Sequence, residues 1–180
     1  YTPAVPQKFE ELVRFRESGI PIIKRAQLLG QISKTMTCMA IAGTHGKTTT
    51  SAILAHLLYK SDVKVTAFLG GILEGYNTNY LCSGTDVMVV EADEFDRSFL
   101  QLDPDFAGIT AMDPDHLDIY GTEEEMHKTF NQFLSNNLQE KGVAIIEKKL
   151  EQLFGTRHET YSLSDASATY HASNLNIVGT

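Results

Sequence analysis

The stretch Ile41-Ala-Gly-Thr-His-Gly-Lys-Thr-Thr-Thr-Ser-Ala52 decides how this chain is interpreted. Its first two residues end the apolar run Thr-Cys-Met-Ala-Ile-Ala at residues 37–42, which predicts a buried strand. It continues into residues 47–59, whose length and composition predict a helix. The loop between them reads G-x-x-G-K-T, shorter than the usual phosphate-binding spacing G-x-x-x-x-G-K-[ST]. The strand–loop–helix setting nevertheless favours a loop that binds phosphate.

The residue types in this loop explain how an anion would be held. Gly43 and Gly46 allow the backbone to turn its N–H groups toward an anion, and the start of the following helix adds partial positive charge. Lys47 can reach the outer phosphates, and Thr48 can place its hydroxyl on Mg²⁺. His45 lies inside the loop, where we expect contact with a ligand through its backbone only.

Composition excludes several classes of function. A formal net charge of -8 at pH 7 argues against nonspecific binding to nucleic acid or anionic lipid. No apolar run is long enough to span a bilayer, and no signal peptide is evident, so we expect a cytoplasmic protein. Cys38 and Cys82 lack C-x-x-C spacing and are predicted to be buried free thiols in a reducing compartment. The ends at Tyr1 and Thr180 suggest a fragment of a longer protein.

The rest of the chain alternates short apolar strands with helical patterns. This alternation predicts an α/β fold with a mostly parallel sheet and helices on both faces. Strands are expected at residues 37–42, 63–69, 86–90, 106–112 and 143–146, and helices at 6–18, 25–32, 47–59, 122–138 and 148–154. In the third of these helices, one apolar face is expected to carry Ile53, Leu54, Leu57 and Leu58. Thr122 is the expected N-cap of the fourth, with Glu125 at the capping-box position. Residues 159–163 and 168–178 suggest edge strands or a hairpin.

A second cluster of polar residues follows the strand at residues 86–90. Four carboxylates come directly after it, at Glu91, Asp93, Glu94 and Asp96. Ligands of open α/β sheets bind beyond the carboxyl ends of the strands, and a carboxylate there can coordinate the Mg²⁺ of a bound nucleotide. Glu91, the first acid after the apolar run, is the best candidate ligand. Mutual repulsion of the four acids favours a metal or a basic partner nearby, for which Arg97 is a candidate.

A third cluster, Asp113-Pro-Asp-His116-Leu-Asp118, follows the strand predicted at residues 106–112. An imidazole flanked by carboxylates can ligate a metal, donate to a phosphate or transfer a proton. His116 is therefore a candidate functional residue, whereas the histidines at 56, 127, 158 and 171 lack such a context.

Together these clusters carry a family resemblance. Gly-Thr-His-Gly-Lys-Thr-Thr, Glu-Ala-Asp-Glu-x-Asp-x-Ser-Phe-Leu and Asp-His-Leu-Asp-x-Tyr, in this order and spacing, resemble the Mur ligases. Ile20-Pro-Ile-Ile-Lys-Arg-Ala-Gln-Leu-Leu also resembles the passage from the first domain of such ligases into their central ATPase domain. The resemblance extends from about Gly19 to Leu138, and within the family it is closest to members that join L-alanine to UDP-N-acetylmuramate.

The resemblance implies a P-loop ATPase-like central domain over residues 35–180, incomplete at its C-terminal end, preceded over residues 1–34 by the end of a UDP-binding domain and a linker. It assigns ATP phosphates to Gly43, Thr44, His45, Gly46, Lys47, Thr48 and Thr49. It assigns one Mg²⁺ to Thr48 and Glu91, and a second metal to His116. The implied reaction in peptidoglycan precursor synthesis forms an acyl phosphate from UDP-N-acetylmuramate and ATP, which the amine of L-alanine then attacks. Lys47, Glu91 and His116 are its catalytic candidates, although the isolated fragment is expected to be inactive.

Two positions depart from the family pattern, and other functions remain open. Ala111 stands where relatives often carry Asn, and Lys128 does not occupy the position of the carbamylated lysine of several sister ligases. One alternative is the recycling ligase that adds a tripeptide to the same sugar nucleotide, and the folate polyglutamylating enzymes fit the later motifs less well. A nucleotide-binding module without chemistry and a small-molecule kinase are rivals from other classes. The oligomeric state is left open.

Overall fold

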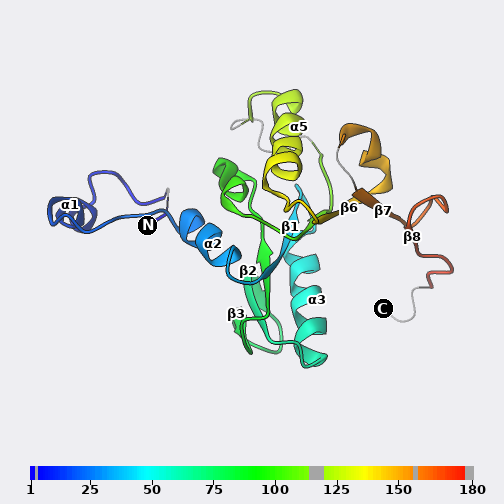
Figure 1. Ribbon diagram of the computed structural model, residues 1–180, viewed down its shortest axis with the longest axis horizontal. Helices are drawn as coiled ribbons and strands as arrows, with labels where there is room; N and C mark the ends of the chain where they lie inside the picture. Colours follow the sequence, from blue (N-terminus) through cyan, green and yellow to red (C-terminus); the bar gives the residue numbers. More distant parts are fainter. Residues whose placement is uncertain (3, 114–119, 156–157, 177–180) are drawn as a thin grey trace.

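The computed structural model describes residues 1–2, 4–113, 120–155 and 158–176, which form a domain around one eight-stranded sheet (Figure 1). The strand order is β3-β2-β4-β1-β5-β6-β7-β8. Every neighbouring pair is parallel except β2 and β3, which pair antiparallel. The strands are β1 Thr37–Ala42, β2 Val65–Leu73, β3 Thr78–Cys82, β4 Val87–Glu91, β5 Phe106–Ile109, β6 Val143–Glu147, β7 His158–Ser162 and β8 Tyr170–His171. The predicted mostly parallel α/β fold is confirmed.

Helical segments cover both faces of the sheet, as expected. The helices are α1 Glu10–Glu17, α2 Arg25–Ser33, α3 Lys47–Lys60 and α5 Glu123–Gln132, with shorter segments η1 Phe95–Gln101, η2 Phe133–Asn137 and η3 Lys148–Leu153. In Figure 1, α3 lies on one side of the sheet, α2 and α5 lie on the other, and α1 stands away from the sheet. Thr122 caps α5 by accepting a hydrogen bond from the backbone N–H of Glu125, as its sequence pattern predicts.

Each face of the sheet has its own hydrophobic cluster. On the α5 side, Phe99, Phe130 and Phe133 are fully buried, and the ring centroids of Phe99 and Phe133 lie 4.8 Å apart. On the α3 side, the small residue Ala55 packs with Val65 and other residues of β2. Burial on both faces explains why the central strands read as continuous apolar runs rather than alternating patterns.

The predicted apolar face of α3 is only half right. Leu54 and Leu58 pack against the sheet, but Ile53 and Leu57 are 56% and 58% exposed. Ala52 and Ala55 face the sheet with the two leucines, so the buried stripe lies one step further round the helix than the large residues suggest.

Several predicted boundaries are also wrong. β2 continues through Gly70-Gly71 because β3, which the sequence analysis missed, pairs with it. β5 is shorter than predicted. β7 and β8 are the last two strands at one side of the sheet and pair in parallel, so of the two alternatives predicted for this part of the chain, edge strands are confirmed and a hairpin is wrong. Cys38 is buried and burial raises its pKa to about 12, but Cys82 is exposed, contrary to expectation. Among the described ranges, none of the helices combines the length and apolar character that a bilayer crossing needs.

The strand order determines where a ligand can bind. β1 lies between β4 and β5, with Ile41 paired to Glu91 on one side and Ala42 paired to Ile109 on the other. The loops after these three parallel strands therefore start at the same edge of the sheet. From β1 the chain crosses to β2, on the β4 side, whereas from the neighbouring strand β5 it continues to β6, on the opposite side. The connections diverge between β1 and β5, which makes their carboxyl ends a topological switch point.

Candidate functional site

The loop after β1 has the conformation that its two glycines predict. Gly43 and Gly46 adopt φ values of 132° and 80°, in the region that favours glycine. A Cβ on Gly43 would lie 2.3 Å from Thr110 Oγ1, so no larger residue fits without displacing the loop after β5. Gly46 is the N-cap of α3 and supplies no capping side chain. The first N–H groups of a helix have no acceptor inside it, which makes this end of α3 suited to an anion.

Hydrogen bonds join this loop to the residues that follow β5. The backbone N–H of Thr44 donates to Ala111 O at 2.9 Å, and the hydroxyl of Thr44 accepts from the N–H of Asp113 at 3.0 Å. Thr110 donates through its hydroxyl to the carbonyls of Ala42 and His45. The buried Thr44 therefore shapes the loop through its contacts with the chain, and the His45 ring is 63% exposed, with Nε2 3.9 Å from Asp113 Oδ2.

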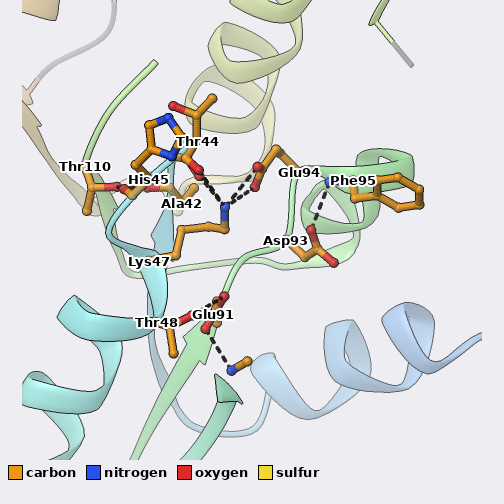
Figure 2. Close-up of polar contacts among 12 residues, drawn as sticks. Ala42, Thr44, His45, Lys47, Thr48, Glu91, Asp93, Glu94, Phe95 and Thr110 are labelled. Atoms are coloured by element: carbon orange, nitrogen blue, oxygen red, sulfur yellow. Dashed lines mark hydrogen bonds and ion pairs between the residues drawn. The ribbon is translucent and has the colours of Figure 1, made fainter. Parts of the chain in front are cut away.

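The Thr48 hydroxyl and the Glu91 carboxylate meet at the start of α3. Thr48 Oγ1 lies 3.0 Å from Glu91 Oε1, and the other carboxylate oxygen accepts from the N–H of Gly70 at 2.8 Å (Figure 2). Gly70 is required for this arrangement because a Cβ there would lie 2.5 Å from both carboxylate oxygens. The Thr48 hydroxyl and the Gly70 N–H are uncharged donors, so neither of them offsets the charge of the carboxylate. Thr49 continues α3 beside them and is exposed.

Lys47 points away from this pair, toward Glu94. Lys47 Nζ lies 2.6 Å from Gly43 O and 2.9 Å from both carboxylate oxygens of Glu94. Figure 2 shows the Lys47 ammonium directed at the Glu94 carboxylate. The side chains are 14% and 1% exposed, so this is a buried ion pair. The hydroxyl of Tyr120 donates to the backbone carbonyl of Glu94 at 2.7 Å, and burial, with the nearby Glu94 carboxylate, raises the pKa of Tyr120.

The remaining acids after β4 have separate partners. Asp93 accepts from the N–H of Phe95 at 3.0 Å, and Asp96 Oδ2 lies 3.7 Å from Lys24 Nζ. Asp96 and Arg97 both have φ of 54°, an uncommon and strained conformation that turns the chain sharply here. The Arg97 guanidinium lies 5.8 Å from the centroid of the Tyr120 ring. The predicted basic partner of these acids was Arg97. In the structure, Asp96 pairs with Lys24 and Glu94 pairs with Lys47.

The donor set at Thr48 and Glu91 fits Mg²⁺, which prefers hydroxyl and carboxylate oxygens and keeps several waters. His116, the third predicted ligand, lies outside the described residues. Within the described ranges, no group of three or more His, Cys, Asp or Glu side chains could hold a metal ion. Among the described residues, Thr48 and Glu91 are thus the pair whose oxygens could contribute to such a cation site.

Two neighbouring cavities open beside Glu91, under α2. One, of about 510 Å³, lies between α2 and the ends of β2, β3 and β4, and Asn79 and Tyr80 are among the residues that line it. The other, of about 270 Å³, lies between α2 and η1. Arg25 and Glu91 line both cavities. Their volumes are in or near the range of small-molecule sites, and both are lined by Glu91, the carboxylate that contacts Thr48.

Comparison with known proteins agrees with this geometry. The family model of the Mur ligase middle domain matches residues 41–178, which include the last two residues of β1, the glycine loop and the acidic end of β4. The chain belongs to the Mur ligase family. It is 48% identical to the UDP-N-acetylmuramate–L-alanine ligase of Parabacteroides distasonis over 98% of the chain, but spans only 39% of that curated relative.

Solved structures of Mur ligases share the fold. The crystal structure of UDP-N-acetylmuramate–alanine ligase MurC from Thermotoga maritima matches with a TM-score of 0.75 and 29% identity, covering 94% of this chain and 39% of that one. The MurF ligase of the same organism, solved in complex with ADP, matches with a TM-score of 0.55 and 21% identity over 76% of this chain and 35% of its own. The second likeness concerns the fold alone.

Sequence reasoning missed several residues that build the site. Glu94 was grouped with its acidic neighbours. Its contact with Lys47 distinguishes it from them, but the two residues are 47 positions apart, so no local pattern shows the contact. Thr110 and Gly70 were not singled out. A polar residue directly after an apolar strand was the available signal for Thr110, and the Gly70-Gly71 pair was read as the end of a strand.

Proposed function

We propose that the protein to which this chain belongs is an ATP- and Mg²⁺-dependent ligase that joins L-alanine to UDP-N-acetylmuramate. The observation that carries the proposal is the meeting of Thr48 with Glu91 beside the Gly43–Lys47 loop, at the switch point of a Mur ligase middle domain. The names of the curated relatives, at 48% identity for the one described above, support the choice of substrates. The ADP complex of the MurF neighbour supports ATP as the nucleotide.

In this proposal the chain holds and aligns the triphosphate. The glycine loop and the start of α3 direct N–H groups at the phosphates, and Lys47 neutralises charge on the outer ones. Thr48 and Glu91 would hold Mg²⁺, which would neutralise negative charge on the phosphates. The muramyl carboxylate attacks the γ-phosphorus and the bond to ADP breaks. The L-alanine amine then attacks the acyl carbon, loses a proton and releases phosphate.

The cavities beside Glu91 suggest where the acid substrate approaches. They adjoin the carboxylate that would carry the metal, so a group bound there lies next to the outer phosphates. Arg25 lines both cavities and brings a cation to an acidic region, which suits a substrate that bears a carboxylate. Holding the two reactants in this relation is the main catalytic task that we assign to the domain.

The test is an assay of the whole protein with ATP, Mg²⁺, UDP-N-acetylmuramate and L-alanine. We expect ADP and phosphate to form in equal amounts with the amide, and no ADP when the sugar nucleotide is left out. Faster reaction with the tripeptide than with L-alanine would identify a recycling ligase. Phosphorylated sugar nucleotide without amide would identify a kinase, and nucleotide binding without turnover a binding module.

His116 and the domain boundaries are separate parts of the proposal. The family pattern makes His116 a ligand of a second metal, so His116→Ala should abolish ligation while ATP affinity stays within about threefold of the unchanged protein. His171→Ala is the matched control, since His171 lies on the exposed edge strand β8. Residues 35–180 are proposed as the central domain, and the isolated chain is expected to bind nucleotide weakly without ligating alanine.

A further inference from the structure

The buried partner of Lys47 has no part in the function proposed so far. Glu94 holds the Lys47 ammonium at 2.9 Å through both carboxylate oxygens, while the same ammonium donates to Gly43 O at 2.6 Å. A lysine in a phosphate loop must present its ammonium to the nucleotide. Here the ammonium is held between its own loop and an acid from another strand.

The two ends of this ion pair differ in freedom. The Glu94 side chain is 1% exposed, and its backbone carbonyl accepts from both the Tyr120 hydroxyl at 2.7 Å and the N–H of Arg97 at 3.0 Å. Lys47 has a flexible four-carbon stem and remains 14% exposed. Glu94 is therefore the fixed end, and the Lys47 ammonium can turn from the loop carbonyls toward a phosphate oxygen while still touching the carboxylate.

We propose that Glu94 is a positioning residue, which fixes the Lys47 ammonium for phosphoryl transfer and lowers nucleotide affinity by offsetting its charge. The inference extends the proposed function, because it concerns the same triphosphate site. Loss of the carboxylate leaves a lysine that attracts polyphosphate more strongly but is less well aligned. The expected signature is thus a separation of binding from turnover, which a purely structural role would not produce.

Glu94→Gln in the whole protein tests this inference, because the amide has nearly the same shape without the charge. We expect MgADP to bind about 3- to 10-fold more tightly and kcat to fall about 10-fold or more. Asp103→Asn is the matched control. Asp103 also pairs with a lysine, Lys34, at 3.3 Å, but it precedes β5 and so lies at the end of the strands opposite the site. It should change neither quantity more than twofold.

A double-mutant cycle shows whether Glu94 acts through Lys47. In a Lys47→Met background, Glu94→Gln should change MgADP affinity less than twofold, because there is no ammonium left to offset. A gain in affinity that persists without Lys47, weaker binding in Glu94→Gln, or an unchanged kcat would each overturn the inference.

Two further arms keep the test independent of folding and of the proposed reaction. Glu94→Asp keeps the charge and withdraws the carboxylate by one methylene, so it should lower kcat and leave affinity within twofold. This variant carries the test if Glu94→Gln fails to fold, and an unchanged kcat for it then counts against the inference. If the unchanged protein forms no amide, the proposed ligase function fails, while the MgADP measurements still decide whether Glu94 offsets Lys47.

Discussion

Glu91 is the last residue of β4 and Glu94 follows three positions later, yet their carboxylates have different partners. Glu91 accepts hydrogen bonds from the hydroxyl of Thr48 and the N–H of Gly70, both uncharged donors. Glu94 is buried against the ammonium of Lys47. A carboxylate bonded to neutral donors keeps its charge for a cation, whereas one paired with a lysine has that charge offset. The comparison distinguishes Glu91, a candidate metal ligand, from Glu94, which we propose positions the Lys47 ammonium.

The largest expected effect is on stability and comes from breaking the buried pair. Lys47→Met leaves the Glu94 carboxylate without its lysine partner, and we expect a loss of about 3 kcal/mol in the free energy of unfolding, measured by urea denaturation. Thr48→Val removes the hydroxyl facing Glu91 in a more exposed setting and should cost less than about 1 kcal/mol. Equal losses in the two variants would contradict the distinction between the two carboxylates.

A smaller effect, confined to the Glu91 side, is expected from Gly70→Ala. The added Cβ would lie 2.5 Å from both oxygens of Glu91, and the end of this side chain can swing away. Stability should therefore change by less than about 1 kcal/mol, but the Mg²⁺ concentration for half-maximal ATP turnover should rise about tenfold as Glu91 leaves Thr48. Gly155→Ala, where a Cβ meets nothing within 4 Å, is the control. An unchanged Mg²⁺ requirement would argue against Glu91 as a ligand.

The smallest effect on the reaction should come from the hydrogen bond between Tyr120 and the backbone of Glu94. Tyr120→Phe removes the hydroxyl that donates to the Glu94 carbonyl, at an expected cost of about 1 kcal/mol in thermal or urea unfolding. We expect kcat to fall a few-fold with little change in the Mg²⁺ requirement, because only the Glu94 side is disturbed. Tyr170→Phe removes a hydroxyl from an exposed ring and should be nearly neutral. A shift in the Mg²⁺ requirement would mean that the two carboxylates are not independent.

Local patterns were sufficient for the central part of the fold. β1 begins and ends at the predicted residues, and α2 and α3 differ from prediction by one residue at their C-terminal ends. These elements combine apolar periodicity with clear boundary signals such as Gly43. Prediction was poorer for β3, a strand with mostly exposed residues, and for the pairing of β7 with β8. A strand at or near the edge of a sheet carries a weak hydrophobic signal, and no local pattern states its partner.

The sequence by itself determined the family, the glycine loop as the candidate phosphate site and Glu91 as the first candidate metal ligand, because glycine, lysine and threonine at this spacing have few other uses before a helix. Only the tertiary structure separated Glu94 from Asp93 and Asp96, and tied Thr110 and Gly70 to the site. These roles depend on which strands are neighbours: placing β4 and β5 on either side of β1 brings side chains tens of positions apart within 3 Å. Strand order is set by packing over the whole sheet, so a local reading of residue types cannot supply it.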